Sequence, residues 1–418
     1  MFKIIKKKLA NNKKIIENFS YLSLLQFFSL FFPLITYPYL LRVLGFQIYG
    51  SIIFAQSITM FVAIVINFGF NISGTRDIAC SREDSIEISK IVSSIYTLKL
   101  VLWLLCLVIY FLAIYLIPFL RENWLLYVVS FFLSFKDLLF PIWLFQGIEK
   151  MKYITLINIG VQLLFVISIF VLVKAKDDFL LVPMLNSCCA FIGGVIALYV
   201  VFIKEKISFV RQPFKTLKYF FNDSLPLFLS SLSTQIYVKA NKVLVGSFLG
   251  MGEVAIYDLG EKVTSLLKVP VSMISQATFP KISREKNIDF VNKVMFITVI
   301  SISVLYLLVF VNSRWIVEAL SGMENEQAVK ILRLLSFSVI ISAVNLFLGG
   351  NRLLPFGYKK YYVLNTIYSC LFYFAGFAFL WSFGLIDLHK VCYMYLGTEC
   401  FMLILNLYNN KKFNLIFQ

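Results

Sequence analysis

Long apolar runs recur along the whole chain, and only short polar segments separate them. A helix needs roughly 20 apolar residues to cross the hydrocarbon core of a bilayer. The runs predict twelve membrane-spanning helices, at 18–41, 49–70, 91–117, 124–147, 154–173, 180–203, 219–247, 255–275, 291–312, 327–350, 362–383 and 391–408. Hydrophobic residues make up 60% of the 418 residues and charged residues only 15%, a balance that excludes a water-soluble globular protein.

Lysine and arginine are distributed unevenly among the connecting segments. If the N-terminus is cytoplasmic, the cytoplasmic segments hold 24 of these residues and the outer loops hold six. Positive charge concentrates in the cytoplasmic loops of membrane proteins, so we expect both termini to be cytoplasmic. Topology also accounts for the formal net charge of +17, and we expect no nucleic-acid partner.

The chain is expected to form two lobes of six helices each. A cytoplasmic basic N-terminus at 1–17 precedes an N-lobe at 18–203, and a basic cytoplasmic linker at 204–218 leads to a C-lobe at 219–408 and a cytoplasmic tail at 409–418. The fold class that we predict is an all-α membrane protein with a central cationic cavity between the lobes. Many transporters consist of two related halves, and their binding site lies at the interface between the halves.

The two predicted lobes share a weak internal repeat. LGFQIYG at 44–50 aligns with LGMGEVAIYDLG at 249–260 if the second loop has three extra residues. The offset is then 205 before the loop and 208 after it, which pairs Tyr49 with Tyr257.

Fourteen charged residues lie inside the predicted spans, nine basic and five acidic. A charge in the bilayer costs about 2.5–3.5 kcal/mol on insertion scales, so these side chains should face a cavity or a partner. They are Lys99, Lys136, Lys239, Lys242, Lys262, Lys268, Lys293, Lys330 and Arg333, with Asp137, Asp223, Asp258, Glu261 and Glu399.

The span at 255–275 has the densest polar pattern. Six polar side chains recur there at steps of three or four and form one stripe: Tyr257, Glu261, Ser265, Lys268, Ser272 and Ser275. Asp258 and Lys262 are four apart with the acid first, the favoured order for an intrahelical ion pair. Two interpretations remain open for them, mutual neutralisation that holds the bundle together and contact with a ligand.

Two other spans show polar patterns. Lys136 and Asp137 lie near the middle of 124–147, one turn before Pro141, either as a buried ion pair with neighbours or at a cavity. Tyr49, Gln56 and Asn67 share one face of their helix, and Tyr237 lies on a polar face of the seventh span.

The sequence indicates neither nucleotide hydrolysis nor metal chemistry. It contains no GxxxxGKS or GxGxxG motif and only one histidine, His389. The longest outer loop, 313–326, is too short for a catalytic domain. We therefore expect a protein that is not an enzyme and that uses no cofactor and no metal.

Several motifs together resemble a known family. PLITYPYLLRVLG at 33–45, NFGFNISGTRDIA at 67–79, PIWLFQGIEKMKYI at 141–154 and FPKISRE at 279–285 resemble the Wzx-type O-antigen flippases of the multidrug/oligosaccharidyl-lipid/polysaccharide exporter superfamily. The resemblance implies a transporter of the bacterial inner membrane. It would move undecaprenyl-diphosphate-linked O-antigen units from the cytoplasmic to the periplasmic leaflet by alternating access. Implied partners are the lipid-linked oligosaccharide, the bilayer, a polymerase and a chain-length regulator.

The resemblance gives the polar residues expected roles. Lys136, Lys262 and Lys268 would hold the diphosphate, and Arg42 and Arg76 would attract it at the outer and inner mouths. The sugar path would be lined by Tyr49, Gln56, Asn67, Tyr237 and Tyr257. Coupling to a proton or sodium gradient would use Asp137, Asp258 and Glu261.

Two alternatives stay open. One is another exporter of the same superfamily, of the multidrug or lipid II type, against which the net interior charge of +4 argues. The other is a membrane polysaccharide polymerase, which would need a longer outer loop than 313–326.

Overall fold

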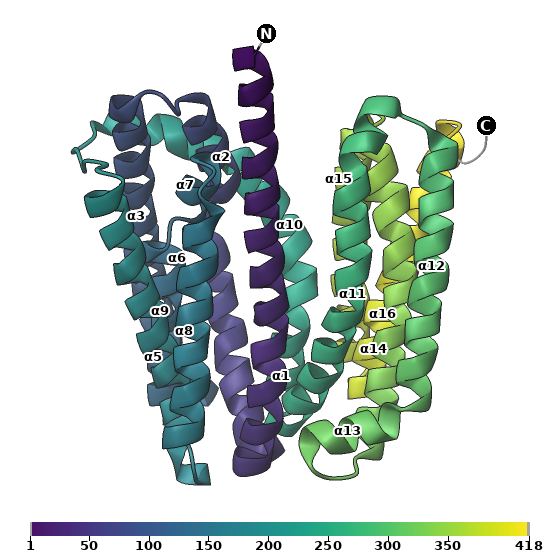
Figure 1. Ribbon diagram of the computed structural model, residues 1–418. Helices are drawn as coiled ribbons and strands as arrows, with labels where there is room; N and C mark the ends of the chain where they lie inside the picture. The colour runs from purple at the N-terminus through teal and green to yellow at the C-terminus, as the bar shows by residue number, and fades with distance from the viewer. Residues whose placement is uncertain (1, 416–418) are drawn as a thin grey trace. The chain divides into compact units, whose positions relative to one another are not determined.

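The computed structural model describes residues 2–415, except for the side chains of 2–16, 19, 230, 233, 234, 237, 238 and 280. The described chain is helical throughout and contains no strand, which confirms the predicted all-α class (Figure 1). It divides into two units. Unit 1 comprises the chain up to Val43 together with Ala55–Leu232, and unit 2 comprises Leu44–Phe54 together with the chain from Ser233 onward.

Unit 1 contains the helices of the first half of the chain and the first part of α10. They are α1 (Phe2–Asn67, apart from its stretch in unit 2), α2 (Phe70–Cys80), α3 (Ser85–Leu116), α4 (Pro118–Glu122), α5 (Trp124–Phe131), η1 (Phe132–Ser134), α6 (Phe135–Leu139), α7 (Ile142–Gly147), α8 (Met151–Leu172), η2 (Lys176–Leu180), α9 (Leu181–Tyr199), η3 (Val200–Lys204) and α10 (Phe214–Phe248). Its core gathers around Trp143, which is completely buried.

Unit 2 contains the remainder of α10 and the helices that follow. They are α11 (Met251–Glu285), α12 (Ile288–Val311), α13 (Ser313–Ser321), α14 (Glu326–Asn345), η4 (Leu346–Leu353), α15 (Lys359–Ser382) and α16 (Leu388–Lys412). Helix α14 packs against α11 and α16, and α15 packs against α16. The segment 313–326, predicted as an outer loop, contains the short helix α13.

Nine segments of the described residues are long and apolar enough to cross a membrane. The first of them, Ser20–Cys80, contains two of the predicted runs. Helices α10 and α11 are not among the nine found in the described residues, and both carry charges within their predicted spans, such as Lys242, Asp258 and Lys268. The multi-pass membrane class is confirmed, and the count of twelve crossings stays a prediction.

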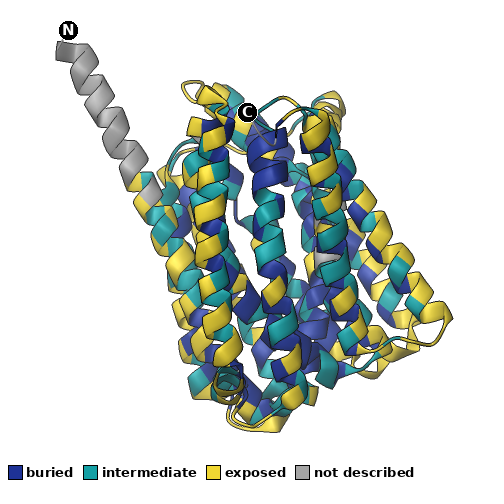
Figure 2. Cartoon of the chain, turned by 90° about the vertical axis from the view of Figure 1, so that its right-hand side faces the viewer, coloured by how far each residue is buried: buried dark blue, intermediate teal, exposed yellow. Residues whose placement is uncertain are grey.

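The outward surface of several helices is apolar. Exposed residues, in yellow, recur along the helices in Figure 2. Among the exposed apolar residues, Leu104 and Val108 on α3 and Ile300 and Leu307 on α12 are each about half exposed or more. By contrast, small polar residues such as Ser93 on α3 are completely buried. Apolar side chains outside and small residues between helices are typical of a bundle surrounded by lipid.

Two glycines adopt the same uncommon backbone conformation 205 residues apart. Gly45 has φ 77° and ψ 167° at the point where α1 bends, and Gly250 has φ 106° and ψ 170° just before α11. This region of φ/ψ space is essentially restricted to glycine. Because 205 is the offset of the sequence repeat, the two positions are structurally equivalent corners, and this supports the repeat.

The fourth predicted span, 124–147, is broken into several short helices. Pro141 lacks an N–H group and restricts the residue before it, so α6 ends at Leu139 and α7 begins at Ile142. Phe140 between them has an extended backbone.

Candidate functional site

A cluster of five interacting polar side chains lies in unit 2. The Nζ atom of Lys242 is 2.5 Å from Oδ1 of Asp258 and 2.5 Å from Oε2 of Glu261, and Nζ of Lys262 is 2.7 Å from Oδ2 of Asp258. The side chain of Asp258 is only 2% exposed. Tyr49 completes the cluster. Its hydroxyl donates to Oδ2 of Asp258 at 3.2 Å and accepts from Nζ of Lys262 at 2.6 Å.

Three separate elements build this cluster. Lys242 comes from the end of α10, Tyr49 from the stretch Leu44–Phe54, and the other members from the first turns of α11. The stretch lies directly against the start of α11, because a Cβ atom on Gly50 would meet the carbonyl oxygen of Met251 at 1.7 Å. Any residue other than glycine at position 50 would force the two segments apart.

The cluster contains two ammonium groups and two carboxylates, so its net charge is zero. The first interpretation of Asp258 and Lys262, mutual neutralisation, describes their geometry. A diphosphate at Lys262 would have to compete with the Asp258 carboxylate at 2.7 Å. The roles of Lys262 in substrate binding and of Asp258 and Glu261 in ion coupling stay predictions.

Lys268 has a different environment. Its Nζ atom donates to the hydroxyl of Tyr395 on α16 at 3.0 Å and lies 5.7 Å from the centre of that ring. No carboxylate of the described chain forms an ion pair with it. Tyr257, which shares the predicted stripe, is buried with 3% exposure. Among the described residues, the partner of Lys268 is therefore a phenol and not an ion-paired carboxylate.

A second polar cluster lies in unit 1 and consists of Asn67, Lys99 and Asp137. Lys99 is 1% exposed, and its Nζ atom donates to Oδ1 of Asn67 at 3.1 Å and to the backbone carbonyl of Asp137 at 2.9 Å. The amide of Asn67 in turn donates to Oδ1 of Asp137 at 2.7 Å. Asn67 thus joins the buried cation to the carboxylate.

The broken fourth span explains how Lys99 is accommodated. In an unbroken helix, the carbonyl of Asp137 would accept a hydrogen bond from the N–H group four residues later. That residue is Pro141, which has no N–H group, so the carbonyl is left for Lys99. Lys136 precedes Asp137 on α6, is exposed, and makes no ion pair within the described chain.

Arg76, Arg42, Gln56 and Tyr237 complete the set of predicted site residues. Arg76 on α2 lies 2.8 Å from Asp77 and 2.6 Å from Asp223, with a 52% exposed side chain. Arg42 on α1 is exposed, and Gln56 on α1 is half-buried. The side chain of Tyr237 lies outside the described part of the structure.

Sequence reasoning missed a buried amide network in unit 2. Asn345 donates to the Glu399 carboxylate at 3.0 Å, Asn406 to Asn345 at 3.2 Å, and Asn365 to Asn406 at 2.9 Å. Helical spacing on α16 could have found part of it, because Glu399, Asn406 and Asn410 fall seven and four residues apart on one face.

Arg352 was also missed. The apolar run predicted to end at 350 places it in a cytoplasmic loop, whereas the structure carries it inward on η4 with 1% exposure. Its guanidinium donates to Oδ1 of Asn292 on α12. Element η4 is a π-helix, and its wider turns shift the helical register of the residues that follow. The sequence pattern does not reveal this shift.

The apolar helices, their exposed apolar side chains and the buried ionic clusters define a multi-pass membrane protein. Two solved structures have a fold similar to that of this chain. One is a multidrug transporter of the MATE family in an inward-facing conformation, with a TM-score of 0.72 and coverage of 92% of this chain and 95% of that one. The other is the lipid II flippase MurJ in an inward closed conformation, with a TM-score of 0.75 and coverage of 93% and 87%. Both are 15% identical, which establishes likeness of fold alone.

The family follows from the sequence. The model of the polysaccharide biosynthesis protein family matches residues 15–286, and the chain belongs to that family. It is 26% identical to a proposed O-antigen transporter of Escherichia coli (strain K12) over 416 residues, which cover 96% of this chain and 99% of that protein. A proposed O-antigen transporter of Shigella dysenteriae is 29% identical over 264 residues, 63% of this chain and 66% of that one, just under two thirds.

These matches confirm the family resemblance that the motifs indicated. The predicted multi-pass localisation is likewise confirmed, and the relatives from two enteric bacteria agree with the inner membrane.

Proposed function

We infer that the chain is a flippase for lipid-linked O-antigen units. It moves an undecaprenyl-diphosphate-linked oligosaccharide from the cytoplasmic to the periplasmic leaflet by alternating access, through twelve spans in two lobes with cytoplasmic termini. The family match, the relatives named as O-antigen transporters and the fold shared with a lipid II flippase support this proposal. It acts as a carrier, not an enzyme, with no cofactor or metal.

The observation that carries the proposal is the environment of Lys268. This lysine lies on the polar stripe of α11, with a phenol as its partner at 3.0 Å and no ion pair among the described residues. A phosphate-bearing headgroup would give Lys268 a directly bound anionic partner, because lysine is a common phosphate ligand. Exposed Lys136 is the second candidate ligand, and Arg42 and Arg76 would attract the headgroup at the two mouths.

The geometry suggests an order among the candidate coupling acids. Asp258 is engaged by two lysines, whereas Asp137 is linked to buried Lys99 through the neutral amide of Asn67. A cation would meet less competition at Asp137 than at Asp258. Coupling to a cation gradient would add to the driving force that the membrane potential already provides. Each negative charge that moves outward across an inside-negative membrane releases about 2.3 kcal/mol per 100 mV.

A second candidate is export of another substrate, because solved multidrug and lipid II transporters share the fold. The substrate can be tested in a strain that lacks its O-antigen flippase. Expression of the chain should restore surface O-antigen and remove the lipid-linked units that accumulate inside. Restored drug resistance without surface O-antigen would favour the second candidate.

The site is tested by Lys268→Ala in the same strain. We expect surface O-antigen to be lost while the amount of membrane-inserted protein, measured by immunoblot, is unchanged. Lys268→Arg should retain partial function because it keeps the charge. Lys293→Ala is the matched control, since Lys293 is an exposed lysine of α12 near a predicted membrane interface. Unchanged O-antigen in Lys268→Ala would remove Lys268 from the site.

A further inference from the structure

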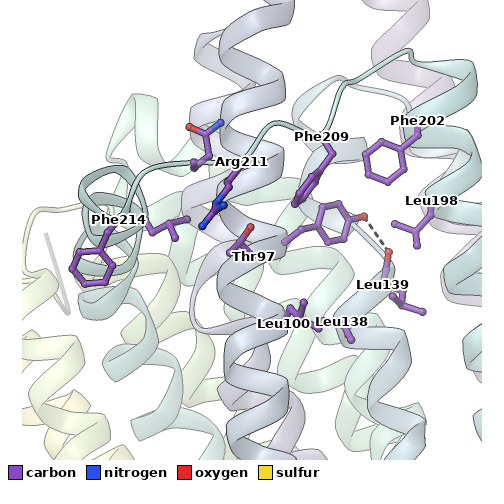
Figure 3. A pocket seen from close by; sticks show the side chains of 12 residues that line it. Thr97, Leu100, Leu138, Leu139, Leu198, Phe202, Phe209, Arg211 and Phe214 are labelled. Carbon is purple, nitrogen blue, oxygen red and sulfur yellow. Dashed lines mark hydrogen bonds between the residues drawn. The ribbon is translucent and has the colours of Figure 1, made fainter.

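An apolar pocket of about 830 Å³ lies in unit 1, and no member of the polar clusters lines it (Figure 3). Leu100 of α3, Leu138 of α6 and Phe202 of η3 form part of its wall. Phe209, from the segment that connects η3 to α10, and Leu217 of α10 also line the pocket. The transport roles proposed above use none of these residues.

The connecting segment is fixed across α3 by two hydrogen bonds. The backbone N–H of Ser208 donates to Oγ of Ser89 at 3.2 Å, and that of Val210 donates to Oγ of Ser93 at 2.9 Å. Irregular backbone close to lipid is tolerated where protein groups satisfy its hydrogen bonds. The two serines therefore hold the segment in place as one edge of the pocket.

Among the described residues that line the pocket, Arg211 is the one that carries a charge. Its side chain extends from the connecting segment toward Thr97 of α3 (Figure 3). The segment 204–218 contains five basic residues and one acid, Glu205, which is paired with Lys150 at 2.5 Å. An apolar cavity with excess positive charge at one edge is complementary to a lipid whose headgroup is anionic. The guanidinium fork is suited to a phosphate.

The depth of the pocket also fits a lipid. Helix α3 has 32 residues, so it is about 48 Å long, whereas the hydrocarbon core is about 30 Å thick. With this surplus at its N-terminal end, next to the basic segment, α3 has its first turns at headgroup level. Leu100 is fifteen residues after Ser85, about 22 Å along the axis, and therefore lies within the adjoining leaflet.

We propose that this pocket binds an anionic glycerophospholipid, with an acyl chain between Leu100, Phe202 and Leu217 and the phosphate at Arg211. Basic pockets between membrane helices on the cytoplasmic side are known to receive anionic headgroups. The occupied pocket holds the connecting segment against α3. Lipid binding at this place does not depend on which substrate the protein carries.

The test is native mass spectrometry of the full-length protein in detergent, titrated with phosphatidylglycerol or phosphatidylcholine of identical acyl chains. We expect phosphatidylglycerol to bind about fivefold more tightly, the contribution of one basic residue near an anionic headgroup. Arg211→Gln should remove this preference. Lys215→Gln is the matched control, because it removes the same charge from the same segment outside the pocket.

Two further variants test the apolar part. Leu100→Trp and Leu217→Trp fill the pocket from two different helices, and each should weaken the binding of both lipids. Elution of each variant as a monodisperse protein checks that it is folded. If only one of the two variants folds, that variant alone tests the apolar part of the pocket. Equal affinity of the wild type for both lipids, or undiminished binding in a folded tryptophan variant, would overturn the proposal. Displacement of phosphatidylglycerol by an equal concentration of undecaprenyl phosphate would overturn it in favour of an isoprenoid occupant.

Discussion

The Nζ atom of Lys262 lies 2.6 Å from the phenolic oxygen of Tyr49, although 213 residues separate them in the chain. The same phenol donates to Asp258. Tyr49 thus links the start of the second predicted span to the charged face of α11. It acts as a polar tie within unit 2, and its predicted place on a sugar path would require that tie to loosen during transport.

Removal of the central carboxylate should destabilise unit 2. Asp258→Asn leaves Lys242 and Lys262 with one acid, Glu261, to share, and breaking a buried ion pair costs about 3–5 kcal/mol. We expect a large fall in the thermal denaturation midpoint of the purified protein in detergent. Asp223→Asn is the control, because it makes the same chemical change at a partly exposed pair with Arg76, where about 0–1 kcal/mol is expected. Equal midpoints for both variants would contradict the structural role of the cluster.

The unit 1 cluster should behave as one energetic unit. Lys99→Met leaves the Asn67 and Asp137 oxygens without their donor, and Asp137→Asn leaves the buried ammonium group without a nearby negative charge, whereas the double variant removes both charges. We expect the double variant to be less destabilised than the sum of the single variants, with a coupling of about 0.5–3 kcal/mol. Thermal denaturation of the four proteins measures this cycle. Strict additivity would show that Asn67 does not connect the two charges.

The two corner glycines should respond alike to substitution. Gly45→Ala and Gly250→Ala each place a side chain in a backbone region that costs about 1–3 kcal/mol. Gly160→Ala on α8 provides the contrast, because a Cβ atom there meets nothing within 4 Å and the helical backbone accepts alanine. It should be neutral or stabilising by about 0.5–1 kcal/mol. A stable Gly250→Ala variant beside an unstable Gly45→Ala variant would argue against equivalence.

Reporter fusions test the twelve-span topology. Alkaline phosphatase fused after Asp178 should be active, since that loop is predicted to lie outside, and inactive when fused after Gln212. Green fluorescent protein at the C-terminus should fluoresce, because it folds in the cytoplasm. The reverse pattern at any of these positions would require a different number of crossings before it.

The hydrophobic pattern was sufficient for the fold class, because apolar runs of membrane length allow little other than helices. Part of the site was equally accessible. Asp258 and Lys262 could be paired because both lie on one helix. Tyr49 and Lys242 could not be added to them, since their proximity depends on how separate segments pack. The partner of Lys99 could not be predicted from the sequence, because Pro141 of another span makes the Asp137 carbonyl available to it.

The charges of α10 and α11 also bear on how the chain enters the membrane during synthesis. A helix released alone into lipid with Lys242 or Asp258 unpaired pays about 2.5–3.5 kcal/mol for that charge. Their ion pair becomes possible only after both helices have emerged from the ribosome. Biogenesis should therefore hold α10 at the translocon until α11 arrives and release the two as a hairpin, whereas a strongly apolar helix such as α12 can partition by itself.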